Sequence, residues 1–202
     1  MHILVTNDDG VYAPGLIALA KAMQLLGKVT ILAPDRNWSA SGHVKTLHRP
    51  LRVKEIVLPD GTPAWTTDGA PSDCVALAVL GVLPESIDLV VSGINPNANF
   101  GHDVTYSGTV TAAMEAVIGG VPGLAFSLHS PEGFKGQLDY GPAARVGRRG
   151  PEVIICAEED ALPGVGHACG HNLFGAGSLG AAIAIKEQIA AGKLKGTVIF
   201  FG

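Results

Sequence analysis

The sequence predicts an α/β fold with a mostly parallel, Rossmann-like sheet in three α/β/α layers. Short β-branched runs alternate along the chain with longer stretches that have the apolar spacing of helices. The composition agrees, because 47% hydrophobic residues and 27 glycines among 202 residues are typical of a globular chain with many tight turns. This alternation favours βαβ units whose strands are covered by helices on both faces.

The expected elements follow one another in chain order. We expect strands at residues 3–6, 29–33, 88–92 and 123–127, and helices over residues 14–26, from residue 71 and from residue 109. Residues 35–67 are more irregular, which predicts a loop with one or two short hairpin strands. In a sheet of this kind, ligands are expected in the crevice beyond the carboxyl ends of the strands.

Charge and cysteine usage restrict the possible functions. A formal net charge of −4 gives no broad attraction for nucleic acid or for an anionic membrane, so no nucleic-acid-binding surface is expected. Three cysteines are too few for a disulfide framework, and no signal-like leader precedes the first strand. The longest uncharged apolar run, residues 75–83, is too short to span a membrane. We therefore expect a cytoplasmic protein with no membrane role.

Oxygen-bearing side chains follow three of the predicted strands. Asp8 and Asp9 come directly after the first strand, Ser39 follows the second, and Asn95 follows the strand that ends at residue 92. Carboxylate, hydroxyl and amide oxygens suit Mg²⁺, Mn²⁺ or Ca²⁺ better than they suit zinc. The alternative for the Asp-Asp-Gly segment alone is a solvated turn with a helix-capping aspartate.

A candidate anion site lies at the start of the helix expected from residue 109. Ser107, Gly108 and Thr109 would expose free backbone N–H groups and the positive end of the helix dipole, which favour a phosphate. An ordinary Ser/Thr helix cap is the alternative explanation. The segment lies on the same side of the sheet as Asp8, Asp9 and Asn95, and a metal facing an anion site suits phosphomonoester hydrolysis.

Four motifs carry a resemblance to a known family. They are LVTNDDG, APDRNWSASGH, TDGAPSDCVALA and SGINPNANFGHDVTYSGTVTAAMEA, and in this order and spacing they resemble the SurE family of 5′/3′-nucleotidases over residues 1–149. The resemblance implies that Asp8, Asp9, Ser39 and Asn95 ligate one divalent cation, Mg²⁺ or Mn²⁺. It also implies phosphate contacts by Ser107, Gly108 and Thr109, with Asn95 beside them, and it allows a homodimer.

The chemistry that this site would perform is hydrolysis of nucleoside 5′- and 3′-monophosphates. The cation would polarise a phosphoryl oxygen and activate a water molecule, and Asp8 or Asp9 could receive the proton. His43 is a candidate donor to the leaving oxygen, and Trp38, beside Ser39, could stack on a nucleobase. No nucleophilic triad and no G-x-x-x-x-G-K-[ST] phosphate loop is present.

The tail, residues 150–202, has a different signature. It resembles the metal-binding region of the amidohydrolase and aminoacylase branch of two-metal peptidases, in which Cys169 and His171 would be metal ligands. A strand at residues 153–157, a helix over 175–191 and a strand at 197–201 would complete a βαβ crossover from this second α/β family. We expect this fragment to pack on the first sheet or to extend it.

Three functional interpretations remain open at this point. The first is a metal-dependent nucleotidase. The second is a remnant of a metal-dependent amidohydrolase or peptidase, which the missing general base disfavours, and the third is an inactive fusion of two truncated hydrolase fragments. Base preference and the cleavage of polyphosphate are not determined by the sequence.

Overall fold

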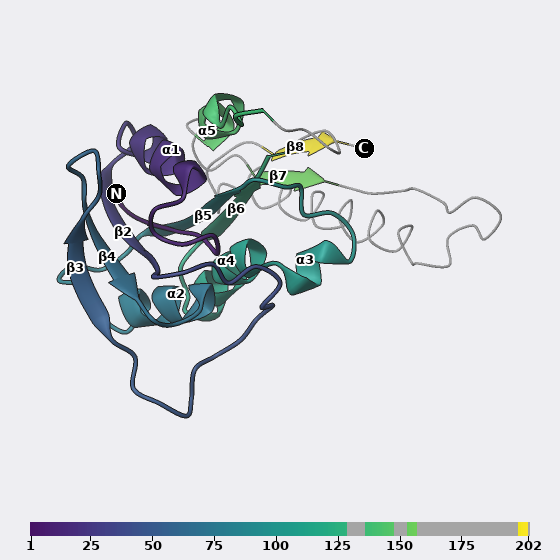
Figure 1. The fold of residues 1–202 in the computed structure, drawn as a ribbon. Coiled ribbons are helices and arrows are strands. Elements are labelled where there is room, and N and C mark those ends of the chain that lie inside the picture. Colours follow the sequence, from purple (N-terminus) through teal and green to yellow (C-terminus); the bar gives the residue numbers. More distant parts are fainter. Residues whose placement is uncertain (129–135, 148–152, 157–197, 202) are drawn as a thin grey trace, which may run out of the picture. The chain divides into compact units, whose positions relative to one another are not determined.

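Figure 1 shows the computed structural model of the chain, which describes residues 1–128, 136–147, 153–156 and 198–201. The chain divides into two compact units, Met1–Arg148 and Arg149–Gly202. The division lies next to the boundary expected at residue 149, while the assignment of the second unit to another family stays a prediction.

The first unit contains a six-stranded sheet with helices on both faces. The strand order is β3-β4-β2-β1-β5-β6, in which only the β3–β4 pair is antiparallel. This arrangement confirms the predicted mostly parallel α/β fold. The elements are β1 His2–Thr6, α1 Pro14–Met23, β2 Lys28–Pro34, β3 Val53–Val57, β4 Pro63–Thr67, α2 Pro71–Val79, β5 Leu89–Asn95, α3 Asp103–Tyr106, α4 Gly108–Ile118, β6 Gly123–Ser127 and α5 Gly141–Gly147.

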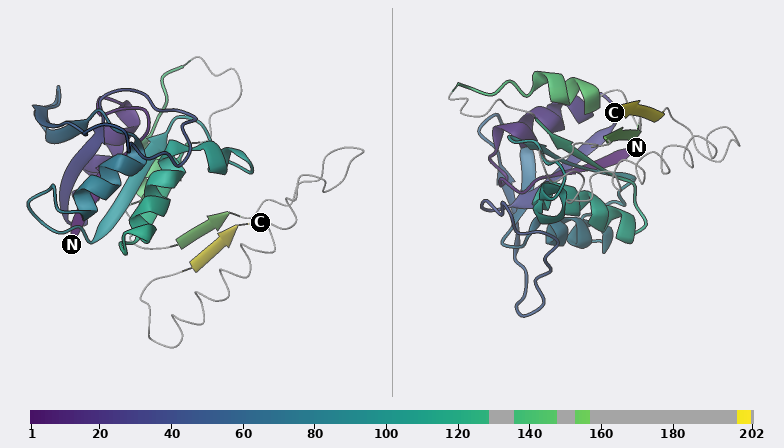
Figure 2. Two further views of the ribbon diagram at one scale, coloured as in Figure 1. Left: turned by 90° about the horizontal axis from the view of Figure 1, so that it is seen from below. Right: turned by 90° about the vertical axis from the view of Figure 1, so that its right-hand side faces the viewer.

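Strand β1 lies at the centre of this sheet, and all five of its residues are buried. Its side chains alternate between two cores, as the two-residue period of a strand requires. Ile3 and Val5 point into the core under α1 and α5, whereas Leu4 points into the core under α2 and α4. Figure 2 shows these helix pairs on opposite faces of the sheet. The three predicted layers are therefore present.

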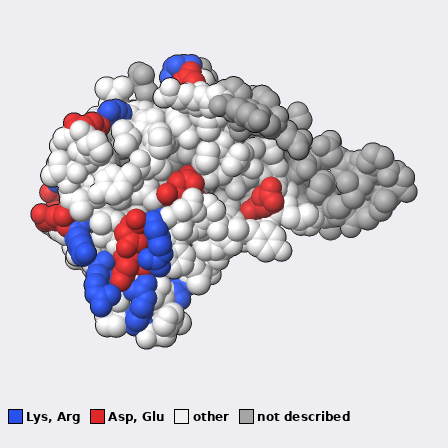
Figure 3. Space-filling model, viewed as in Figure 1, with Lys and Arg blue, Asp and Glu red and all other residues white. Residues whose placement is uncertain are grey.

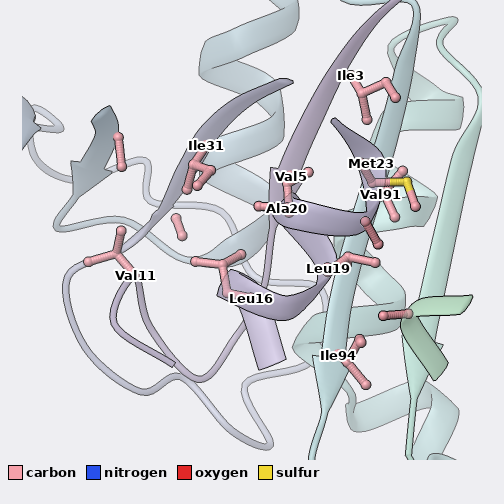
Figure 4. Close-up of a cluster of buried hydrophobic side chains, with 14 of the residues drawn as sticks. Ile3, Val5, Val11, Leu16, Leu19, Ala20, Met23, Ile31, Val91 and Ile94 are labelled. Atoms are coloured by element: carbon pink, nitrogen blue, oxygen red, sulfur yellow. The ribbon is translucent and has the colours of Figure 1, made fainter. Parts of the chain in front are cut away.

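Helix α1 covers its face of the sheet with residues spaced as a helix requires. Leu16, Leu19 and Met23 are each at most 1% exposed and pack on the strands (Figure 4). The helix ends at Met23, three residues before the predicted end. The chain must turn there, because Lys28 N–H donates to the carbonyl of Met1 and begins β2 beside β1.

Strand β5 is longer than the sequence predicts, and this changes the setting of one candidate residue. The expected strand ends at residue 92, but β5 continues to Asn95, with an irregularity in its pairing to β6 between Ser92 and Asn95. Pairing resumes at Asn95 and Ser127. Asn95 is thus the last residue of a strand rather than a loop residue. Helix α3, a single turn, is also absent from the sequence-based expectation.

The second unit contributes two short strands to the described residues. Strand β7, Val153–Cys156, pairs in parallel with β8, Val198–Phe201, with Val153 opposite Val198. Both strands agree with those expected at residues 153–157 and 197–201. The helix expected over residues 175–191 lies outside the described residues, as do Cys169 and His171.

Candidate functional site

A tight turn follows β1 and presents the two candidate carboxylates. The side-chain amide of Asn7 closes the turn, since it donates to the Gly10 carbonyl at 3.1 Å and its oxygen accepts from Gly10 N–H at 3.2 Å. Gly10 has a φ of 102°, a conformation that favours glycine. Asn7 is 1% exposed, so this turn is an integral part of the fold.

Asp8 is buried and is held by the first turn of α4. Its side chain is 3% exposed, and its Oδ1 accepts a hydrogen bond from the hydroxyl of Thr109 at 2.6 Å. Thr109 is itself fully buried. The end of β1 and the start of α4, two segments that the sequence predicts to share one crevice, are therefore in direct contact.

Asp9 is partly exposed beside Asp8. Burial is the main cause that raises the pKa of Asp9, and the negative charge of Asp8 adds to it, so that the pKa reaches about 6. The side-chain amide of Asn37 donates to Oδ1 of Asp9 over a long 3.4 Å. Two neighbouring carboxylates with little compensation form a local negative site that a cation would stabilise.

The loop that follows β2 lies against the same turn. Trp38 N–H donates to the backbone carbonyl of Asp8 at 2.7 Å. Ser39 is the next residue, so the backbone of Ser39 follows a direct contact with the turn that carries Asp8 and Asp9. Ser39 is exposed, and its N–H donates to Oδ1 of Asn37 at 2.7 Å. The guanidinium of Arg36 lies over the Trp38 ring at 4.8 Å from the ring centre.

Asn95 ends β5, the parallel neighbour of β1. The pairing of Thr6 with Ser92 places the ends of these two strands side by side. Asn95 is half-buried, and its side-chain nitrogen donates to the carbonyl of Asn97 at 2.6 Å. Because this bond uses the nitrogen, the amide oxygen is the atom that remains suited to a cation.

The start of α4 is buried against Asp8. The Ser107 hydroxyl caps the helix by accepting from Val110 N–H at 3.2 Å, so the ordinary cap considered for the sequence is present. Gly108 has no room for a side chain, because an added Cβ would lie 2.7 Å from Cβ of Asp8. The side chains of Ser107 and Thr109 are thus engaged, which leaves the first backbone N–H groups of the helix as the candidate anion donors.

Three residues near this site were not singled out from the sequence. Tyr140, just before α5, is half-buried, and its pKa is raised first by burial and then by the charge of Asp9. Glu115 and Lys45 form an ion pair at 2.6 Å.

His43, the candidate donor to the leaving oxygen, also binds Glu115, with Nε2 at 2.8 Å from Oε2. Because its ring is bound to α4, we assign it no role at the leaving oxygen. The only sequence signal for this pairing is a charged residue on an otherwise apolar helix.

Several buried polar atoms near the site have no hydrogen-bond partner among the described residues. The hydroxyls of Ser41 and Ser92 and the indole N–H of Trp38 are buried with no hydrogen-bond partner in the part of the chain that the structure describes. Buried polar atoms of this kind are expected to bind water or a ligand. Within the same described ranges, no three His, Cys, Asp or Glu side chains are grouped to hold a metal, so a cation here would need the hydroxyl and amide oxygens as well.

The charged surface is mixed on the face shown in Figure 3. Lys and Arg side chains gather there with acidic ones over β3 and the loop before it, while most of the remaining described surface on this face is uncharged. Asp68 pairs with Arg49 at 2.8 Å and with Arg52 at 3.2 Å. Among the described residues, no helix has the length and apolar character needed to cross a membrane.

Comparison with known proteins gives a consistent result. The family model "Survival protein SurE" matches residues 3–155, which extends past the boundary expected at residue 149. A 5′-nucleotidase SurE of Herpetosiphon aurantiacus is 55% identical over 163 residues, covering 81% of this chain and 62% of that protein. A 5′-nucleotidase SurE of Geobacter sulfurreducens is 56% identical over 128 residues, covering 63% of this chain and 47% of that protein.

A solved structure agrees with the sequence relatives. The SurE protein of Aquifex aeolicus matches with a TM-score of 0.62 and 41% identity, covering 73% of this chain and 57% of that chain. The chain spans about 62% of the length of the first curated relatives that it matches. With a family model matching residues 3–155 and relatives above 50% identity, the chain belongs to the SurE family.

Proposed function

We propose that this chain is a metal-dependent phosphomonoester hydrolase that releases phosphate from nucleoside 5′- and 3′-monophosphates. The observation that carries the proposal is the contact between Asp8 and Thr109, which joins a carboxylate pair to the N-terminus of α4. The proposed cation site and the proposed anion site would then face one another at one edge of the sheet, an arrangement that supports metal-assisted hydrolysis of a phosphate ester. The names of the relatives, 5′-nucleotidase SurE, support the same activity.

The proposed cation ligands are Asp8, Asp9, Ser39 and Asn95. Their oxygens are the hard donors that Mg²⁺ and Mn²⁺ prefer. The pKa of Asp9 is raised first by burial and then by the charge of Asp8, and a cation would oppose both effects by stabilising the ionised form. When bound, the cation would supply Lewis-acid stabilisation of the phosphoryl group and a more acidic water. Both metals are compatible with this set of donors.

The protein's own groups would bind the phosphate and handle the proton. The first N–H groups of α4, at Gly108 and Thr109, are donors without an intrahelical acceptor, and the helix dipole favours an anion beside them. Asp9 is the more exposed of the two carboxylates and could receive the proton of the attacking water. Asp8, fixed by Thr109, would keep one cation ligand in place.

The experiment is phosphate release from 5′-AMP and 3′-AMP by the purified chain. It is performed with Mg²⁺ or Mn²⁺, with a chelator, and with the Asp8→Asn variant. A matched control is Glu85→Gln, which removes a carboxylate from an exposed ion pair with Lys28, away from the site. We expect metal-dependent release that Asp8→Asn abolishes and Glu85→Gln preserves.

No release from a folded, monodisperse sample would contradict the proposal and favour the inactive fusion instead. Activity without metal would contradict the assigned ligands. The amidohydrolase assignment of the tail, the homodimer and the cytoplasmic location all stay predictions.

A further inference from the structure

Helix α4 has an unusual distribution of polarity. Glu115 is its only charged residue, yet its side chain is only 10% exposed. Met114, Val117 and Ile118 on the same helix are 51%, 64% and 71% exposed. A carboxylate is rarely buried on a helix unless it has partners that compensate for its lost hydration.

Both oxygens of Glu115 are bound by basic side chains of one loop. Nζ of Lys45 lies 2.6 Å from Oε1, and Nε2 of His43 lies 2.8 Å from Oε2. Both partners belong to the loop that follows β2 and carries Ser39. Pairs in a partly buried setting are screened less by salt than exposed ones, and removal of one partner leaves an uncompensated group.

The same short segment is bound to α2, α3 and α4 by further contacts. Gly42 N–H donates to the Tyr106 carbonyl at 2.9 Å, and the Thr111 hydroxyl donates to the Gly42 carbonyl at 3.1 Å. Thr111 and Glu115 are one helical turn apart and therefore face the loop together. Beyond Lys45, the Thr46 hydroxyl donates to Oδ2 of Asp73 in α2 at 2.7 Å.

These contacts hold residues 42–46 of the loop, while its earlier part is bound to the turn that carries Asp8 and Asp9. Trp38 N–H donates to the Asp8 carbonyl, so Ser39 lies between that bond and the anchor at Glu115. We infer that Glu115 is a positioning residue: through Lys45 and His43 it holds the segment of residues 39–46 against α4 and thereby keeps Ser39 at the cation site. This inference rests on the proposed function, since it assigns Ser39 to a metal.

The test compares Glu115→Gln with Glu85→Gln in the full chain. Both variants remove one carboxylate and retain the size of the side chain, but the ion pair of Glu85 with Lys28 is exposed. Isothermal titration with Mn²⁺ measures metal affinity without any need for turnover. We expect Glu115→Gln to weaken Mn²⁺ binding by about 10-fold or more, in line with residues that orient metal ligands, and Glu85→Gln to leave it unchanged.

Limited trypsin digestion reports on the loop directly. Cleavage after Arg36 and Lys45 should be faster in Glu115→Gln than in the wild type, while the melting temperature shows that the fold persists. If Glu115→Gln does not fold, Lys45→Met serves in its place, with cleavage after Arg36 as its readout. Lys45→Arg retains the charge and should retain Mn²⁺ binding.

The outcomes separate the inference from the proposed function. Unchanged Mn²⁺ affinity in a folded Glu115→Gln variant overturns the inference, whether or not the loop becomes sensitive to trypsin. A wild-type chain that neither binds Mn²⁺ nor releases phosphate contradicts the proposed function, and the inference with it. Weakened binding together with faster cleavage, absent from Glu85→Gln, supports both.

Discussion

The hydroxyl of Thr109 donates to Oδ1 of Asp8 at 2.6 Å and joins the end of β1 to the first turn of α4 across 101 residues of sequence. Both side chains are buried, at 0% and 3% exposure. One carboxylate of the candidate site is thus oriented by a residue that belongs to the proposed phosphate-binding segment. The two halves of the site therefore depend on each other through this bond.

Replacement of Thr109 by valine should weaken both stability and activity. Valine keeps the volume but leaves the buried Asp8 oxygen without its donor, which costs about 1–3 kcal/mol. We expect a lower urea midpoint and a lower kcat/KM for 5′-AMP with Mn²⁺. Thr109→Ser, which retains the hydroxyl, is the control and should recover most of the activity; equal losses in the two variants would show that the bond is unimportant.

Gly108→Ala should displace Asp8 or the start of α4. The added Cβ would lie 2.7 Å from Cβ of Asp8, closer than real contacts allow, and a tight 3.1 Å from Cγ of Pro71. We expect a destabilisation of about 1–3 kcal/mol by urea denaturation and a loss of phosphate release. Gly147→Ala is a suitable control, because its added Cβ would meet only side chains, at 3.0 Å or more, the nearest being the flexible end of Met23. A Gly108→Ala variant as active as the wild type would refute the close packing.

The stability of the metal-free protein should depend on Asp9 between pH 4 and 6. The pKa of this carboxyl is raised from 3.8 to about 6, so in this window the folded state binds more protons than the unfolded state. Stability from this group is therefore lost as pH rises through the window. In a chelator-containing buffer, Asp9→Asn should show a smaller decline in urea midpoint from pH 4 to pH 7 than the wild type, and parallel declines would contradict the shift.

Asp68 should have the opposite pH dependence. Its pKa is lowered to about 2, first by the backbone N–H of Arg52, with Arg49 adding a hydrogen bond and its charge. Its contribution is thus present above pH 4 and is lost as pH falls toward 2. The difference in denaturation midpoint between the wild type and Asp68→Asn should be measurable at pH 7 and should shrink at pH 3; a constant difference would argue against the ion pairs.

Much of the fold follows from local patterns in the sequence. The strand expected at residues 3–6 is present as β1, and α4 begins one residue before the expected start, with Ser107 as its cap. The end of β5 was not predictable in this way. Gly93 favours the end of a strand, but renewed pairing of Asn95 with Ser127 on β6 extends β5 beyond it. Pairing with a distant strand is not visible in a local window.

The candidate site shows the same limit. Sequence positions after the strand ends were enough to select Asp8, Asp9 and the loop of Ser39 as neighbours, because parallel strands end at one edge. The contact of Thr109 with Asp8 and that of His43 with Glu115 could not be predicted from the sequence. Their partners are 101 and 72 residues apart, respectively. Whether a side chain faces a ligand or another side chain is decided by packing, which sequence spacing does not specify.

The central position of β1 also bears on how unfolding would disrupt the candidate site. Strand β1 lies between β2 and β5 and is buried throughout, so we expect its amide hydrogens to exchange with solvent mainly through unfolding of the whole first unit. Asp8 and Asp9 follow this strand after Asn7, whereas Ser39 lies on the loop that follows β2. We therefore expect the carboxylates to stay in place for as long as the unit is folded, while the position of Ser39 depends on the contacts of its loop.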